Sequence, residues 1–234
     1  MSRNGESLIE MRDVCCRRGD ASITGVSLSI APPCFYFLRG AGASLLLRVA
    51  TLLEEPDDGV MALAGESVRE MDEATRATVR SRTFGFVFDA PFLLPEMSVA
   101  ENIAMPLFKV LNLDAVEARD RTEAMLRLAA LEPLAVRRAG ELSLFEQQRV
   151  ALARAVAHRP VLLALDHPDL NLSSEDSVEL LRLARRVCSE LGIGVLALCV
   201  HHADVRADES VLHVTDGGVR EEAGAAIGVR EQTS

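Results

Sequence analysis

Three stretches of the sequence place Gly-rich or polar residues directly after an apolar run. They are Gly40-Ala41-Gly42-Ala43-Ser44, Asp89, and Asp166 with His167. Open α/β sheets bind ligands at the carboxyl ends of their strands, so these residues are candidates for chemistry. A Gly-containing turn before a helix offers N–H groups to an anion, a carboxylate can hold Mg²⁺, and a His can move a proton near neutral pH.

The residues from Leu142 to Pro168 predict a helix followed by a buried strand. Ser143 stands where an N-cap belongs and Glu146 follows three residues later, which is the capping-box pattern. Apolar residues then recur at helical spacing, namely Val150, Leu152, Ala153 and Val156. The continuous apolar run 161–165 is typical of a strand buried on both faces, and it places Asp166 at the carboxyl end.

This stretch resembles the signature helix and Walker B strand of ABC transporter ATPases. The family pattern is Leu-Ser-Gly-Gly-Glu-Gln-Gln-Arg, followed by a strand that ends in Asp-Glu-Pro. Ser143, Glu146 and Asp166 match this pattern, whereas Leu144 and Phe145 replace the two glycines. His167, the residue after Asp166, replaces the family glutamate.

The resemblance covers nearly the whole chain, from Leu8 to Gly218. The residues Phe84 to Leu107 are similar to one branch in particular, the lipoprotein-releasing, macrolide-exporting and cell-division ABC ATPases. The resemblance implies an ABC-type P-loop NTPase fold of class α/β. Such a fold has a mixed central sheet flanked by helices, an antiparallel β subdomain and an inserted α-helical subdomain.

The turn at residues 40–44 falls where the family has its P-loop, Gly-x-x-x-x-Gly-Lys-Ser/Thr. In a P-loop, N–H groups cradle phosphate, the lysine neutralises it and the hydroxyl binds Mg²⁺. Aligned through the following helix, Ala43 takes the lysine position, Ser44 the hydroxyl position and Phe37 the first glycine. In the alternative register Gly40 is that first glycine and the loop is about three residues shorter. The lysine is absent in both registers, and a plain strand-to-helix turn would explain the same residues.

Two further positions differ from the family pattern. The family stacks an aromatic ring on adenine just before Gly19, where this chain has Arg18. An Arg can stack on a base, and it can equally be a solvated surface residue. The family glutamine that contacts Mg²⁺ and the attacking water is replaced by Asp89. This carboxylate is either a metal ligand or a polar strand terminus.

The resemblance implies that Asp166 would hold Mg²⁺ through water, together with the Ser44 hydroxyl. His167 takes the place of the glutamate that polarises the attacking water. It is either a general base or a mark of lost hydrolysis. His201 matches the switch histidine that senses the γ-phosphate, and in a shifted register this residue is His202.

In this family two subunits sandwich ATP between the P-loop of one and the signature residues of the other. Here the signature residues are Ser143, Leu144, Phe145 and Glu146. The family glycines let the backbone approach the γ-phosphate closely. We therefore expect Leu144 and Phe145 to block that approach and to leave two apolar side chains at the interface.

Composition limits the classes of protein that this chain fits. The 234 residues suit one α/β domain, and 49% hydrophobic residues allow a large core. A net charge of −10 argues against nonspecific nucleic-acid binding. We see no run that approaches the ~20 apolar residues of a membrane helix and no signal-peptide pattern. The five cysteines show no metal-ligand spacing and are interpreted as reduced structural thiols.

Hydrophobic runs and turn residues predict alternating strands and helices after an initial antiparallel pair. The predicted strands are 8–14, 23–30, 34–38, 59–65, 84–88, 161–165, 194–200, 211–214 and 218–222. The predicted helices are 45–53, 73–80, 99–110, 115–131, the helix after Ser143, and 174–191. We expect Pro106 to kink or end its helix. The chain is interpreted as a single domain, 1–234, with the helical subdomain at about 96–142.

Nearly every position that the family uses for chemistry has changed, whereas the scaffold positions remain. Losing one positioned electrostatic group typically costs about 10²–10³ in rate, so several losses should leave no useful turnover. We interpret the chain as an ABC-type subunit that has become a pseudo-ATPase, with ATP and Mg²⁺ binding weak or absent. The alternatives are an active ATPase that uses Asp89, Asp166 and His167, and a soluble protein-interaction scaffold.

The resemblance also implies partners and a location. A permease would dock on the helical subdomain and on the loop from Asp89 to Pro95, and a second ABC ATPase-like subunit would complete a homodimer or heterodimer. The chain would then be cytoplasmic and peripheral on the inner face of the membrane. Candidate permease contacts are Phe92, Leu93, Leu94 and Met97, although buried packing would also explain these residues.

Overall fold

The computed structural model describes residues 7–199, 205–215 and 218–224. The helices are α1 (Ala43–Ala50), α2 (Glu73–Thr83), α3 (Val99–Lys109), α4 (Ala115–Leu128), α5 (Leu144–Ala157) and α6 (Ser174–Leu191). The strands are β1 (Ile9–Arg18), β2 (Ala21–Ile30), β3 (Phe35–Arg39), β4 (Asp58–Leu63), β5 (Glu66–Ser67), β6 (Phe84–Phe88), β7 (Leu162–Asp166), β8 (Gly194–Leu198), β9 (Ser210–Thr215) and β10 (Gly218–Ala223). His201 and His202, the two candidates for the switch histidine, lie outside the described residues.

The strands form two sheets. The larger has the order β10-β9-β3-β8-β7-β6, in which β9 to β6 run parallel and β10 is antiparallel to β9. The smaller sheet is antiparallel, with the order β2-β1-β4-β5. This arrangement confirms the predicted mixed central sheet and the predicted antiparallel β subdomain.

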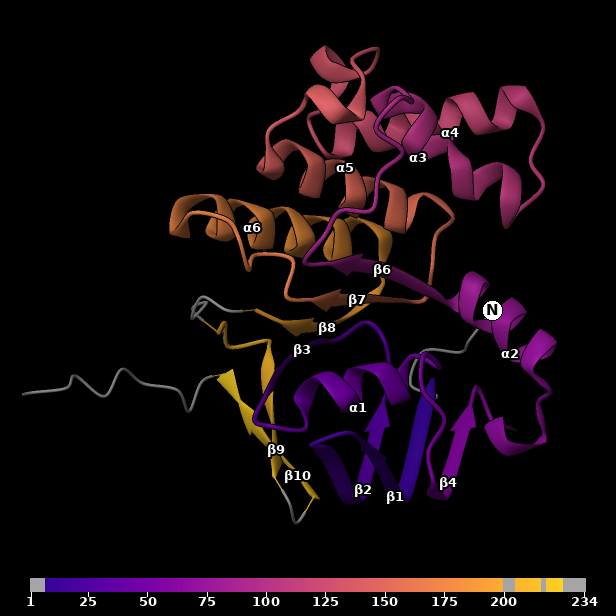
Figure 1. The fold of residues 1–234 in the computed structure, drawn as a ribbon, viewed down its shortest axis with the longest axis vertical. Coiled ribbons are helices and arrows are strands. Elements are labelled where there is room, and N and C mark those ends of the chain that lie inside the picture. Colours follow the sequence, from indigo (N-terminus) through magenta and orange to yellow (C-terminus); the bar gives the residue numbers. More distant parts are fainter. Residues whose placement is uncertain (1–6, 200–204, 216–217, 225–234) are drawn as a thin grey trace, which may run out of the picture.

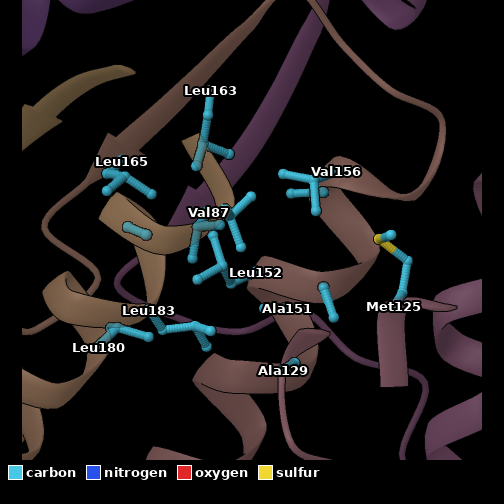
Figure 2. Close-up of a cluster of buried hydrophobic side chains, with 14 of the residues drawn as sticks. Val87, Met125, Ala129, Ala151, Leu152, Val156, Leu163, Leu165, Leu180 and Leu183 are labelled. Carbon is cyan, nitrogen blue, oxygen red and sulfur yellow. The ribbon is translucent and has the colours of Figure 1, made fainter. Parts of the chain in front are cut away.

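The central strands are buried on both faces because neighbouring residues alternate between two cores. In β7, Leu163 and Leu165 join the core under α5 and α6, whereas Leu162 and Ala164 join the core around α1. In Figure 1, α5 and α6 cover one side of the larger sheet, and α1 lies on the other side, toward the smaller sheet. Figure 2 shows the first core, where Val87 lies against Leu152 of α5.

The helices α3 and α4 pack on α5 and extend the first core away from the sheet (Figure 1). Pro106 lies inside α3, which continues to Lys109, so the proline does not end the helix, and the alternative of a kink stays a prediction. Ile103 and Leu107, on either side of Pro106, are fully buried. Their packing holds the helix together, although the proline ring removes one backbone donor.

Several element ends differ from the predicted ones. β1 continues past the predicted end at residue 14 to Arg18, because it pairs with β2 as far as Ala21. The pairing contains register shifts, so the polar residues of this stretch do not show the regular alternation of a strand. The first helix begins at Ala43 instead of 45, so Ala43 and Ser44 lie in its first turn. None of the helices in the described part of the chain is long and apolar enough to span a membrane.

Candidate functional site

Most of the candidate residues lie along the carboxyl edge of the larger sheet. β6 and β7 pair in parallel with Phe88 opposite Asp166, so Asp89 and Asp166 leave neighbouring strands at the same edge. β3 ends two strands away from β7 and leads into α1. This edge is where an open α/β sheet binds its ligands.

The connection from β3 to α1 is short. β3 runs through Arg39, whose register partner in β9 is His213, and α1 begins at Ala43. Only residues 40–42 therefore connect the strand to the helix. Phe37, which the ungapped register places at the first P-loop glycine, lies inside β3 and is 4% exposed.

Both glycines of this connection lie tightly against neighbouring strands. Gly40 has a φ of +108°, and a Cβ built on it would lie 2.1 Å from the carbonyl oxygen of Val214. A Cβ on Gly42 would lie 2.8 Å from the carbonyl oxygen of Ser22 in β2. The N–H of Ala43 donates to the carbonyl of Gly40 at 3.1 Å. The turn is thus closed on itself and covered by β9 and β2.

A P-loop places four residues between its first and second glycines and carries a lysine after the second. The described connection has one residue, Ala41, between Gly40 and Gly42, and Ala43 follows. The residues present therefore provide neither the length nor the lysine with which such a loop holds the phosphates of ATP.

Asp166 and His167 form a hydrogen-bonded pair at the end of β7. His167 Nδ1 lies 2.9 Å from Asp166 Oδ1. The backbone of His167 is in the left-handed region, with a φ of +53°, and its N–H donates to the carbonyl of Leu198 at 2.9 Å. Within the described ranges, no group of three or more His, Cys, Asp or Glu side chains could hold a metal ion.

The loop after β6 is fastened to α5 through its backbone. Asp89 turns its carboxylate back to accept the N–H of Ala90 at 2.8 Å. Gln148 Nε2 donates to the carbonyls of Phe88 and Asp89 at 2.9 and 2.8 Å. The half-buried Arg154 donates to the carbonyls of two further loop residues, Pro91 and Phe92, at 2.8 and 2.7 Å. These contacts fix the path of the loop.

Sequence reasoning missed the anchoring roles of Gln148 and Arg154. Both residues lie among buried alanines and other apolar residues of α5, such as Ala151, Ala153 and Ala155. A buried polar residue must find hydrogen-bond partners, so the place of Gln148 on the buried face was the available signal. The partners lie about 60 residues away in sequence, and the spacing of residues does not reveal them.

The start of α5 has the predicted capping box. The Ser143 hydroxyl accepts the N–H of Glu146, and the Glu146 carboxylate accepts the N–H of Ser143 at 2.8 Å. This backbone hydrogen bond is the main cause of the lowered pKa of Glu146. Phe145 packs partly against the first core, with the guanidinium of Arg149 5.6 Å from its ring centre. Leu144 is half-buried.

Arg18 is engaged by its own chain. Its Nε lies 2.9 Å from Glu54 Oε2 and its Nη1 lies 2.8 Å from Asp57 Oδ1. Its Nη2 donates to the carbonyl of Glu55 at 2.8 Å. Hydrogen bonds from Arg18 lower the pKa of both carboxyl groups. The guanidinium is thus committed to this ion-pair network.

Comparisons with known proteins agree with one another on the kind of relative that they find. The ABC transporter family model matches residues 25–169. The chain is 36% identical to the lipoprotein-releasing system ATP-binding protein LolD of Hyphomonas neptunium, over 76% of this chain and 78% of that protein. It is 36% identical to LolD 2 of Caulobacter vibrioides, over 83% and 86% of the two chains. It is 32% identical to the macrolide export ATP-binding/permease protein MacB of Syntrophobacter fumaroxidans, over 97% of this chain but 33% of that protein.

Solved structures show the same fold. The ATP-binding cassette MJ0796, in a dimeric post-hydrolysis state bound to ADP and Pi, superposes with a TM-score of 0.76 at 27% identity. The superposition covers 92% of this chain and 98% of that chain. CbiO1 of Clostridium perfringens has a TM-score of 0.81 at 21% identity, with 95% and 90% of the two chains covered, and this likeness concerns the fold alone.

Proposed function

The chain belongs to the ABC transporter family, and from this premise we propose that it is a cassette subunit with a degenerate nucleotide site. It would act as a structural or regulatory partner in a transporter of the lipoprotein-releasing or macrolide-export type. Its relatives are named as ATP-binding proteins of such systems. Residues 1–234 would form a single cassette domain with its helical subdomain at about 96–142.

One observation carries the proposal, namely the three-residue connection from β3 to α1. It lacks the lysine of a P-loop, and its Ala43 N–H is already hydrogen-bonded to Gly40. Enlarging the turn would require moving it away from Val214 and Ser22, whose carbonyls close over Gly40 and Gly42. Binding of ATP would then be weak or absent, because the phosphate charge would meet no lysine and few free N–H groups.

We expect ATP to give the pure protein no saturable stabilisation, with or without Mg²⁺, up to millimolar concentration. A ligand that binds only the folded state would raise the unfolding temperature in a concentration-dependent way. The measurement is thermal unfolding with increasing ATP, with isothermal calorimetry as an independent check. A saturating shift in both assays would contradict the proposal.

An active ATPase is the second candidate, and the hydrogen bond between His167 and Asp166 favours it. A carboxylate can orient an imidazole so that the ring accepts a proton from water. This candidate requires Mg²⁺-dependent release of phosphate by the pure protein and its loss in Asp166→Asn. Phosphate release that the substitution leaves unchanged would come from a contaminating enzyme.

The loop from Asp89 to Pro95 would contact the permease at the cytoplasmic face of the membrane. Phe92 is 67% exposed and Leu94 is 43% exposed, although the carbonyl of Phe92 is held by Arg154. Phe92 has a φ of +46° and meets Phe88 edge to face at 5.9 Å. Leu93 packs against the first core, so it is less suited to a partner contact. A second cassette subunit would complete the assembly, as in the dimeric cassette MJ0796.

We expect Phe92→Asp to reduce recovery of a permease subunit about tenfold or more, as for an exposed aromatic anchor in an interface. The measurement is copurification from native membranes followed by mass spectrometry. Val60→Asp is the matched control, because Val60 is 60% exposed in β4 and lies outside both this loop and the helical subdomain. Equal recovery with both variants would contradict the assigned contact. Recovery of neither a permease nor a second cassette with the unmodified chain would contradict the transporter role.

A further inference from the structure

Two cysteines that are 154 positions apart in sequence line one surface cavity. Cys34 directly precedes β3, and Cys188 lies in the last turns of α6. The cavity has a volume of about 470 Å³ and lies beside the buried ion pair of Arg185 with Glu209. Cys34 is half-buried and Cys188 is 9% exposed.

The two sulfur atoms lie around the same peptide unit at the start of β8. The Cys188 thiol donates a hydrogen bond to the carbonyl of Ile193. A Cβ built on the next residue, Gly194, would lie 3.0 Å from Cys34 Sγ. Cys188 Sγ is also 3.9 Å from the carbonyl oxygen of Cys34. Both side chains therefore lie against the peptide that joins Ile193 to Gly194, where we expect the thiols to meet after a change of rotamer.

We propose that Cys34 and Cys188 are a redox-active dithiol that an oxidant of the disulfide or peroxide class converts into an intramolecular disulfide. Two S–H bonds break and one S–S bond forms. The two protons and two electrons pass to the oxidant, which yields two thiols from a disulfide or two waters from hydrogen peroxide. The new bond would tie the start of β3 to the end of α6.

The other cysteines are less suited to this reaction. Cys15 and Cys16 are neighbours in β1, where successive side chains point to opposite faces. Cys16 Sγ contacts the carbonyl of Glu55, and Cys199 lies against a separate small cavity near Asp169. The pair at the start of β8 is therefore the one that we expect to react internally.

The environment of the pair makes its oxidation slow at neutral pH. Burial raises the pKa of Cys34 to about 12 and that of Cys188 to about 11. Since the thiolate is the attacking form, the rate should rise about tenfold for each pH unit below these values.

The test oxidises the folded 234-residue chain with oxidised glutathione at pH 9, followed by intact-mass analysis and non-reducing peptide mapping. We expect the loss of two hydrogens and one linked peptide pair that contains Cys34 and Cys188. Either Cys34→Ser or Cys188→Ser should abolish the link, whereas a Cys15→Ser/Cys16→Ser double variant should retain it. The reference is the same oxidation of urea-unfolded protein, in which all cysteine pairings compete. A higher yield of the Cys34–Cys188 disulfide in the folded chain shows that the link depends on the fold.

A second measurement tests whether the disulfide fits the native fold or distorts it. The oxidised chain should unfold at a higher temperature than the reduced chain, because the bond closes a long loop in the unfolded state. A reducing agent should reverse the increase. A folded chain in which the Cys34–Cys188 link is absent at pH 9, or forms no more than in urea, overturns the proposal. A link that lowers the unfolding temperature also overturns it, since the two thiols would then not be placed for bonding in the native fold.

Discussion

Ala43→Lys alone will bind ATP no better than the unmodified chain, whereas the same substitution with three residues inserted after Gly40 will restore binding. The insertion yields the spacing Gly-x-x-x-x-Gly-Lys-Ser from Gly40 to Ser44. The lysine can neutralise phosphate only if a loop of this length also offers its N–H groups. In the present turn, β3 continues through Arg39 and leaves no such loop.

The expected size of the effect makes the experiment decisive. A ligand at 100 times its dissociation constant stabilises the folded state by about 2.7 kcal/mol. For a chain of this size, each kcal/mol raises the unfolding temperature by about 2–4 °C. The insertion without the lysine is the matched control. Binding by Ala43→Lys alone would show that the missing charge, and not the length of the turn, removes the nucleotide.

Gly40→Ala will destabilise the fold by about 4 kcal/mol or more, a loss of the size that severe overpacking causes. The new Cβ would lie 2.1 Å from a backbone carbonyl in β9, which no change of rotamer can relieve. The left-handed φ of +108° adds its own strain. The measurement is the free energy of unfolding in urea, followed by circular dichroism.

Gly65→Ala is the control for this prediction. Gly65 also has a positive φ, +84°, but its added Cβ would meet no atom within 4 Å. We expect this variant to lose only about 1–2 kcal/mol, the cost of the left-handed backbone. Equal losses in the two variants would mean that β9 moves away from Gly40 at little cost, so the turn would be less tightly held than the structure shows.

The sequence was most informative where local signals coincide. β6 has its predicted bounds, and α6 begins and ends at the predicted residues. Both depend on short-range features, namely a continuous apolar run and a 3.6-residue apolar period. The capping box of Ser143 and Glu146 is also a local pattern, and the structure contains both of its hydrogen bonds.

Features that depend on distant partners were not predictable in the same way. Arg39 follows an apolar run and precedes glycine, which favours a loop, yet its pairing with His213 of β9 extends β3. Tertiary contacts here decide between conformations that the local sequence allows. Phe145 packs partly against the first core and against Arg149 of its own helix, and the expected exposure of Leu144 and Phe145 to a partner subunit stays a prediction.

The anchoring of the loop after β6 also determines how its sequence can diverge. Gln148 and Arg154 bind main-chain carbonyls, which every amino acid carries, so these hydrogen bonds do not depend on the identity of the loop side chains. Phe92 and its neighbours can therefore be exchanged to suit a different partner while the backbone stays in place. A lineage could change the protein that it contacts through a few substitutions in this loop, provided that the two anchors on α5 are retained.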